Sequence, residues 1–322
     1  MTLSRGSALA VGLALAFAAG GCASVQVAVN RNADIQSVKR VAVLPFAVRD
    51  EGQSVWLEGA WETEMMRLGY VVVERGDVQD ILREQGLSLA GITREDQAPR
   101  IGMILGVEGL LLGSGTPERP TVRLVSLATG QTLWSVAYHD ESYLASPRKM
   151  ADGVEGELRA AAWRPAVVVR DSSTSRARLF GSGSGRRVAV NTFKGSDPEE
   201  WADRAGTAFL QAGADIVERA RLEELLKEHA LSLSGVVSEA GAVKLTQVLG
   251  ADSVLMGGGF GRPYRRTAGT MMGAGVSGYK FALKLVSLET GQLKWSGYGM
   301  IADPDDRETF TAIFLATAGS AR

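Results

Sequence analysis

The sequence predicts an α/β (α+β) fold made of two tandem copies of one domain, each a mixed β-sheet covered by helices. First, residues 73–116 align with residues 217–260 without a gap, and 16 of the 44 aligned positions are identical. Second, apolar runs and amphipathic stretches follow the order β-α-β-α-α-β-β-β in each copy. Third, the early strands need crossover connections and the late strands need only tight turns, which is typical of a mixed sheet.

Each copy begins with a strand and a helix. Residues 41–46 and 188–193 are short apolar runs, rich in β-branched residues, as expected of buried strands. The helix that follows has one apolar face, formed by Leu57, Trp61, Met65 and Leu68 in the first copy and by Trp201, Ala205, Ala208 and Ala212 in the second. A second strand is expected at residues 70–73 and 215–217.

Two more helices, a strand and a hairpin complete each copy. The second helix is expected to begin after Val73-Glu74-Arg75 or Val217-Glu218-Arg219 and to end near Leu-Ser-Leu-x-Gly. Gly91 and Gly235 stand where the residue that ends the second helix must adopt the left-handed conformation, and the third helix is expected to end at Gly106 or Gly250. Strands at 110–112 and 254–256 then lead into hairpins with a Thr-Gly turn, at 129–130 and 290–291.

The resulting division of the chain has five parts. We expect a signal peptide at 1–21, a lipidated tether at 22–36, a first domain at 37–163, a linker at 164–185 and a second domain at 186–318. The linker prediction rests on residues 172–185, which are rich in Ser, Gly and Arg. Each domain carries a full set of strands and helices and is therefore expected to hold its own core.

The N-terminus has the three parts of a secretory signal peptide. Arg5 precedes an uncharged apolar stretch at 8–19, which is too short to span a membrane, and small residues follow. Residues 19–22 (Ala-Gly-Gly-Cys) resemble a bacterial lipobox, so Cys22 is predicted to be lipidated. The alternative is ordinary cleavage after Ala18, which would leave Cys22 as an incidental thiol. Ala23 and Ser24 favour the outer membrane, because an Asp after the Cys commonly retains Gram-negative lipoproteins at the inner membrane.

Composition excludes several classes of function. The 322 residues carry a formal net charge of -1, which gives no indication of a nucleic-acid partner. With two His and one Cys, the chain cannot assemble a zinc or iron site from several such ligands. We therefore predict no metal, no cofactor and no catalytic residues.

Three motifs have alternative readings, and we interpret each as structural. Gly113-Ser114-Gly115 and Gly257-Gly258-Gly259 could be phosphate loops, but both lead towards a strand rather than a helix. Glu74-Arg75 and Glu218-Arg219 could hold an acid beside a cation, yet a carboxylate without a second positioned acid or His is poor general-acid machinery. His139-Asp140 could begin a Ser-His-Asp set, but no G-x-S-x-G is present.

These motifs give each copy a resemblance to a known family. With its Val-Glu-Arg, Leu-Ser-Leu-x-Gly and Leu-Val-Ser-Leu-x-Thr-Gly-x-x-x-Trp segments, each copy resembles the periplasmic domain of the curli-secretion lipoprotein family. It is more distantly similar to lipoprotein activators of penicillin-binding proteins. The resemblance implies a periplasmic, lipid-anchored, non-enzymatic part used in secretion or envelope assembly, often as an oligomer.

The second copy departs from the first by an insertion at about 261–279. Channel-forming members of the family insert two hairpins into the outer membrane, and this insertion stands where the first hairpin would be. Three arginines and five glycines break the alternation that a membrane strand needs. We interpret the insertion as an adaptable loop whose Tyr264, Met271, Met272 and Tyr279 are candidates for binding a partner.

The leading hypothesis is therefore an outer-membrane lipoprotein on the periplasmic face, with a structural or assembly role through contacts with envelope or secretion proteins or with itself. The alternatives are a subunit of an oligomeric secretion channel and an activator of a cell-wall synthase. About 18 residues separate Cys22 from the first predicted strand, a typical reach of roughly 23 Å. Fully extended they reach about 60 Å, which disfavours an inner-membrane synthase as partner. Val25, Val27 and Val29 alternate as if part of this tether were a strand.

Overall fold

The computed structural model describes residues 25–48, 51–74, 86, 97–116, 119–138, 146–161, 187–191, 193–195, 197–211, 214–217, 248, 250–261 and 279–301. Several predictions lie outside these residues: the signal peptide and Cys22, the second helix of each copy, His139, the linker, Tyr264, Met271 and Met272. Among the described helices, none is both long enough and apolar enough to cross a membrane.

The first copy is a six-stranded mixed sheet in the order β1-β6-β5-β4-β2-β3. Its strands are β1 (Val25–Val29), β2 (Arg40–Val43), β3 (Val71–Val72), β4 (Gly109–Gly115), β5 (Pro120–Ser126) and β6 (Thr132–Tyr138). Strand β2 runs parallel to β3 and β4, and the remaining pairs are antiparallel. The early strands therefore do use crossovers and the late ones tight turns, as predicted.

Helices cover both faces of this first sheet. They are η1 (Ile35–Ser37), α1 (Glu51–Arg67), α3 (Ala98–Leu105) and α4 (Pro147–Ala160). Helix α3 ends at Gly106 as predicted, where the φ of 62° is left-handed, and it packs on one face through Ile101 and Leu105. Helices α1 and α4 pack on the other face. The sequence analysis did not predict α4, which begins where Ser146 accepts a hydrogen bond from the Lys149 N–H at 3.3 Å.

The second copy repeats the arrangement in the order β12-β11-β10-β7-β9, with β8 beside β10. Its elements are β7 (Arg187–Val190), β8 (Lys194–Gly195), α6 (Pro198–Gln211), β9 (Asp215–Val217), β10 (Ser253–Phe260), β11 (Tyr279–Ser287) and β12 (Leu293–Ile301). Even irregularities recur: the β5–β6 and β11–β12 hairpins shift register at Leu124/Val125 and at Leu285/Val286. The predicted fold class, two mixed sheets flanked by helices, is confirmed.

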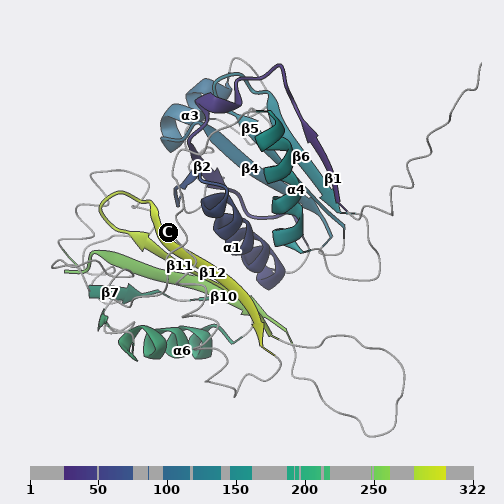
Figure 1. The fold of residues 1–322 in the computed structure, drawn as a ribbon. Helices are drawn as coiled ribbons and strands as arrows, with labels where there is room; N and C mark the ends of the chain where they lie inside the picture. The colour runs from purple at the N-terminus through teal and green to yellow at the C-terminus, as the bar shows by residue number, and fades with distance from the viewer. Residues whose placement is uncertain are drawn as a thin grey trace, which may run out of the picture.

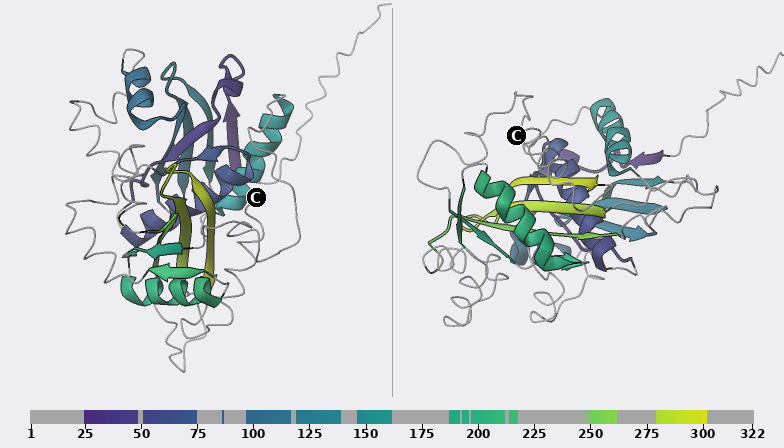
Figure 2. Two further views of the ribbon diagram at one scale, coloured as in Figure 1. Left: turned by 90° about the vertical axis from the view of Figure 1, so that its left-hand side faces the viewer. Right: turned by 90° about the horizontal axis from the view of Figure 1, so that it is seen from below.

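Helix α1 of the first copy lies between the two sheets, and α6 lies on the far side of the second sheet (Figures 1 and 2). One hydrophobic cluster therefore contains Trp61 and Met65 of α1 together with Ala282 and Val286 of β11. The expectation that each copy holds its own core thus holds only in part. The reason is that α1 is buried on both sides, with Trp56 6% exposed and Ala60 0%.

The N-terminal part of the first domain also differs from the prediction. Residues 25–29, assigned to the tether, form strand β1, which pairs with β6 from Val25 opposite Tyr138 to Val29 opposite Trp134. The valines at 25, 27 and 29 pack against the hydrophobic cluster of α1 and α4. Burying them stabilises the strand in the sheet, so the segment is part of the fold rather than a free tether.

The glycine clusters lie inside β4 and β10, so these two strands extend beyond the predicted ranges 110–112 and 254–256. A Cβ added at Gly113 would stand 2.1 Å from the Phe46 ring, and one at Gly257 would stand 3.1 Å from the Phe193 ring. Each glycine thus leaves room for an aromatic ring at the equivalent place in each copy.

Candidate functional site

The most distinctive set of polar side chains lies between α1 and the second sheet. We call this the inter-copy interface. It joins α1, together with Val73 and Glu74 after β3, to strands β10, β11 and β12 and the turn before β12. Gly59 marks how closely the two copies approach, because a Cβ added there would stand 2.5 Å from the Ala282 Cβ. Such contact leaves little room for water, so polar groups in the interface must satisfy one another.

A buried lysine occupies the centre of the interface. Lys284, in the middle of β11, has a side chain only 12% exposed. Its Nζ lies 2.9 Å from Glu58 Oε1, 3.0 Å from Glu62 Oε1 and 2.5 Å from Glu74 Oε2. Glu58 and Glu62 stand one turn apart on α1, so both carboxylates reach the same strand. Three carboxylates thus surround one ammonium, and we call these four residues the Lys284 cluster.

The imbalance of charge in the Lys284 cluster shifts its protonation. Burial raises the pKa of Glu62 well above its usual value, and Glu74 and Glu58 raise it further, while Lys284 lowers it without cancelling the effect. Burial alone would lower the pKa of Lys284, but attraction to Glu58, Glu62 and Glu74 outweighs burial and raises that pKa well above its usual value. The ammonium therefore stays charged, and the Glu62 carboxyl holds its proton to a higher pH than an ordinary glutamate does.

Backbone pairing holds Glu74 in place. Val73 forms an isolated antiparallel bridge with Gln292, and the Glu74 N–H donates to the Gly291 carbonyl at 2.9 Å. Gly291 belongs to the Thr-Gly turn of the second copy, so this turn directly meets the end of β3. The hairpin turn that the sequence predicts thus has a second use, since it joins the copies.

Neutral hydroxyl groups lie beside the cluster. Thr63 Oγ1 and Ser296 Oγ are 2.8 Å apart, and Thr63 Oγ1 donates to the Gly59 carbonyl at 2.9 Å. Next to them, Lys280 Nζ lies 4.4 Å from the centre of the Trp56 ring, within range of a cation–π interaction. These contacts fix the position of α1 along the strands.

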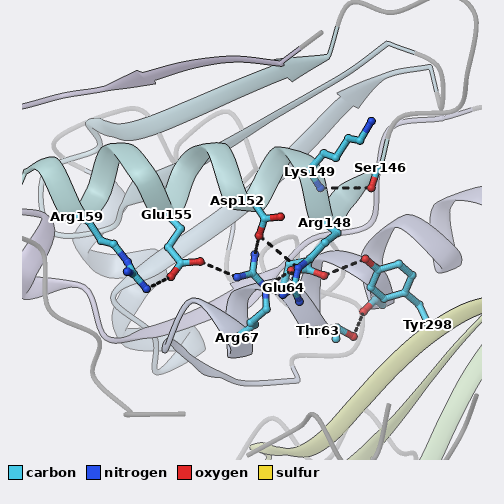
Figure 3. Close-up of polar contacts among 11 residues, drawn as sticks. Thr63, Glu64, Arg67, Ser146, Arg148, Lys149, Asp152, Glu155, Arg159 and Tyr298 are labelled. Atoms are coloured by element: carbon cyan, nitrogen blue, oxygen red, sulfur yellow. Dashed lines mark hydrogen bonds and ion pairs between the residues drawn. The ribbon is translucent and has the colours of Figure 1, made fainter. Parts of the chain in front are cut away.

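A second charged network extends the interface to α4 (Figure 3). Glu64, 2% exposed, accepts from Arg67 Nε at 2.6 Å and from the Tyr298 hydroxyl at 2.9 Å. Arg67 also pairs with Glu155 at 2.7 Å and with Asp152 at 2.8 Å, both on α4. Burial raises the pKa of Tyr298, and Glu64 raises it further, so the hydroxyl remains a donor. The network connects α1, α4 and β12 through one arginine and one buried carboxylate.

The geometry of the Lys284 cluster indicates what it can do chemically. Glu58, Glu62 and Glu74 each offer an oxygen within 4.8 Å of the others, a spacing that could hold a cation. The Lys284 ammonium already contacts an oxygen of each, so the cluster supplies its own cation. We interpret it as an electrostatic connection between the copies, in agreement with the structural reading of Glu74.

The residues predicted from the sequence have different outcomes. Tyr279, expected at the end of an exposed loop, is 7% exposed, and its ring centre lies 5.8 Å from that of Trp201. It belongs to the core of the second copy, because β11 begins at this residue and pairs it with Ile301. Cys22, Tyr264, Met271 and Met272 lie outside the described residues and remain predictions.

The sequence analysis did not single out Glu58, Glu62 or Lys284. A signal was present: Lys284 interrupts the apolar run 281–286, and a lysine buried in a strand needs an opposite charge nearby. Glu58 and Glu62 flank Trp61 on a helix predicted to be amphipathic with one buried face. Their partner is more than 220 residues away, so local periodicity could not connect them.

The fold and this interface define the class of protein: a tandem α+β protein whose two mixed sheets share one helix. Residues 66–116, from the last turn of α1 through the end of β4, match the family model for the curli production assembly/transport component CsgG. The match confirms the resemblance to this family that the sequence motifs predicted. No curated protein gives a significant match.

Solved structures similar to parts of the chain include three proteins. The LpoB C-terminal domain from Salmonella enterica is 19% identical, with a TM-score of 0.28 over 39% of this chain and 90% of that chain. Lipoprotein GNA1162 from Neisseria meningitidis is 17% identical, with a TM-score of 0.29 over 42% of this chain and 99% of that one. The PelC dodecamer from Paraburkholderia phytofirmans is 16% identical, with a TM-score of 0.26 over 48% and 95%.

The protonation of Glu62 leads to a pH-dependent prediction. Its pKa is higher in the folded than in the unfolded chain, so its contribution to stability is present at acid pH and is lost as the pH rises through the folded pKa. Glu62→Gln mimics the protonated carboxyl. We expect it to raise the free energy of unfolding by about 1 kcal/mol at pH 8 and to have no effect below pH of about 4.

Urea unfolding at both pH values tests this expectation. Glu157→Gln is the matched control, because the Glu157 side chain is 48% exposed and Arg31 Nη2 lies 3.9 Å from its carboxylate. If Glu62→Gln destabilises the protein equally at both pH values, Glu62 is ionised throughout and the inference about its pKa is wrong.

Proposed function

We propose that this chain is a lipid-anchored protein on the periplasmic face of the outer membrane, which acts in secretion or envelope assembly through protein contacts and catalyses no reaction. The observation that carries the proposal is the match of residues 66–116 to the curli production assembly/transport component model. The use of buried charges supports it. Glu62, Glu64 and Lys284 join α1 to the second sheet, so each is committed to holding protein surfaces together.

The position of β1 sharpens the proposed anchoring. Strand β1 begins at Val25, so two residues separate it from Cys22. Even fully extended, that connection reaches only about 10 Å, far less than the 60 Å allowed by the tether that the sequence predicted. A diacylated Cys22 would hold the end of the first sheet that contains Val25 and Tyr138 beside the bilayer. This favours a partner at the outer membrane over a synthase in the inner membrane.

Labelling and fractionation test the anchor. Wild-type protein is expected to incorporate labelled palmitate and to sediment with outer membranes. Cys22→Ser should lose the label and appear in the soluble periplasmic fraction. Equal labelling of the two proteins, or a soluble wild type, contradicts the anchor.

Crosslinking in cells tests the assembly role. A photo-reactive amino acid placed at Met271 or at Met272, in the proposed partner-binding insertion, is expected to yield adducts with outer-membrane proteins or with this chain. A matched position is Met103 in α3, which is 78% exposed and outside the insertion. Adducts chiefly with a penicillin-binding protein would instead support a synthase activator.

A further inference from the structure

The duplicated architecture leaves one face exposed on each copy. Within the chain, the outer side of α1 packs on the second sheet. The equivalent helix of the second copy is α6, and its outer residues Asp203, Thr207 and Leu210 are exposed. The equivalent face of the first sheet carries Thr121 and Arg123, which are exposed as well. The inter-copy interface therefore joins two unlike surfaces, and the molecule displays a second example of each.

The equivalence of the two helices is specific. At a shift of 144, Trp61 corresponds to Ala205 and Met65 to Phe209, and all four are buried on their own sheets. The same shift aligns Thr63 with Thr207. Both threonines donate to the carbonyl four residues earlier, at 2.9 Å in α1 and at 2.8 Å in α6. The side chain of Thr207 on α6 therefore has the same orientation as that of Thr63, the threonine of α1 that contacts the second sheet.

The equivalence of the two sheets is equally specific. At a shift of 161, Leu124 corresponds to Leu285 and Trp134 to Trp295, as the matching register shifts confirm. This alignment places Ser135 where Ser296 stands. The hydroxyl pair Thr63 and Ser296, 2.8 Å apart within the chain, thus has counterparts of identical type in the exposed Thr207 of α6 and the half-buried Ser135 of the first sheet.

The two exposed faces carry opposite charges, with acids on the helix and bases on the sheet, as in the inter-copy interface. In the inter-copy interface the acids lie on the helix side and the base lies on the strand. On the exposed faces, Glu200 and Asp203 are on α6, while Arg119 and Arg123 are on the first sheet at the positions of Lys280 and Lys284. The acids of α6 stand at the positions of Trp56 and Gly59 rather than at those of Glu58 and Glu62, and Glu200 already pairs with Arg204 on α6. The exposed Asp203 is therefore the acid best placed to meet an arginine of the first sheet, and this opposite charge favours the approach of the two faces.

We propose that α6 of one molecule docks on the first sheet of a second copy of this chain, on the part of its α3 face that carries the exposed Thr121 and Arg123, in the way that α1 docks on the second sheet. Such a contact is heterologous, since it joins the helix end of one molecule to the sheet end of the next. Repetition generates a ring where the rotation closes and a filament where it does not.

The contact between molecules differs from the internal one in strength. Asp203 and Thr121 replace the closely packed Gly59 and Ala282, so α6 must stand further from the strands than α1 does. The Lys284 cluster is not repeated, because Glu58 and Glu62 correspond to Ala202 and Gly206, and salt screens the exposed charges that replace it. The association is therefore weaker than the internal interface, reversible and sensitive to ionic strength.

Cysteine crosslinking between two differently tagged chains tests the proposal. One full-length chain carries Thr207→Cys and the other Ser135→Cys, both with Cys22→Ser, which removes the only natural cysteine. A short bismaleimide is expected to give a heterodimer, and a chain with both cysteines should give a ladder or a closed ring. Because the anchor is absent, the result is independent of the proposed membrane function.

Two controls make the outcome decisive. Asn32→Cys, at an exposed position away from both faces, replaces Thr207→Cys and should give at least about fivefold less heterodimer. Arg123→Glu should reduce the specific heterodimer, Arg123→Lys should retain it, and raised salt should weaken it. Equal yields with Thr207→Cys and Asn32→Cys, or an unchanged yield with Arg123→Glu, would overturn the proposal.

Discussion

We expect Lys284→Met to lower the free energy of unfolding by about 3–5 kcal/mol, the cost typical of removing one partner from a buried ion pair. The methionine fills nearly the same volume, so packing around β11 is largely kept. What is lost is the ammonium that Glu58, Glu62 and Glu74 share at 2.9, 3.0 and 2.5 Å. The acidic groups would then lie in a site with little water and without an opposite charge.

Chemical denaturation measures the effect, with Lys149→Met as the control. Lys149 lies on α4 with an exposed side chain, and its contribution to the start of that helix comes from its backbone N–H. Its replacement is expected to change the free energy of unfolding by less than about 0.5 kcal/mol. A third protein, Lys284→Met with all three glutamates changed to glutamine, should recover part of the loss, because the buried charge is gone. If Lys284→Met unfolds at the same midpoint as Lys149→Met, the cluster is not what joins the copies.

Most of the fold of each copy could be predicted because its signals are local. The run at 188–193, the Thr-Gly turn at 290–291 and the end of the third helix at Gly106 each depend on neighbours in the sequence. The duplication supported these predictions, because the same pattern predicts the same element in both copies. The sequence predicts that the glycine clusters lead towards a strand rather than a helix, and Gly113 and Gly257 lie within strands β4 and β10 themselves.

The contacts between distant segments could not be predicted in this way. The alternation of Val25, Val27 and Val29 indicated a strand, but nothing local shows that β6 is its partner across more than 100 residues. The periodicity of α1 indicated one apolar face, toward its own sheet. It could not reveal that the opposite side meets β11, because the signal there is small and polar: Gly59, Thr63 and two glutamates.

Gly59→Leu is expected to separate the two copies. A Cβ at this position would already stand 2.5 Å from the Ala282 Cβ, a distance that real side chains do not adopt. Leucine adds three more carbons, so α1 must move away from β11. The movement would separate Thr63 from Ser296 and Glu58 from Lys284, whose atoms are now 2.8 Å and 2.9 Å apart. We expect a loss of about 3 kcal/mol, the upper part of the range for overpacked sites.

The matched control is Gly156→Leu, on α4, where an added Cβ meets nothing within 4 Å. A residue with a side chain is a better helix former than glycine, so this change should be neutral or slightly stabilising, by up to about 1 kcal/mol.

The readout that separates local strain from loss of the interface is association of the two fragments after cleavage of the predicted linker at 172–185. Wild-type and Gly156→Leu fragments should remain together on gel filtration, because one hydrophobic cluster spans both copies. Gly59→Leu fragments should elute apart while each keeps its helical and strand content. If the Gly59→Leu fragments stay together, α1 tolerates the displacement. If the wild-type fragments separate, the shared hydrophobic cluster does not hold the copies together without the linker.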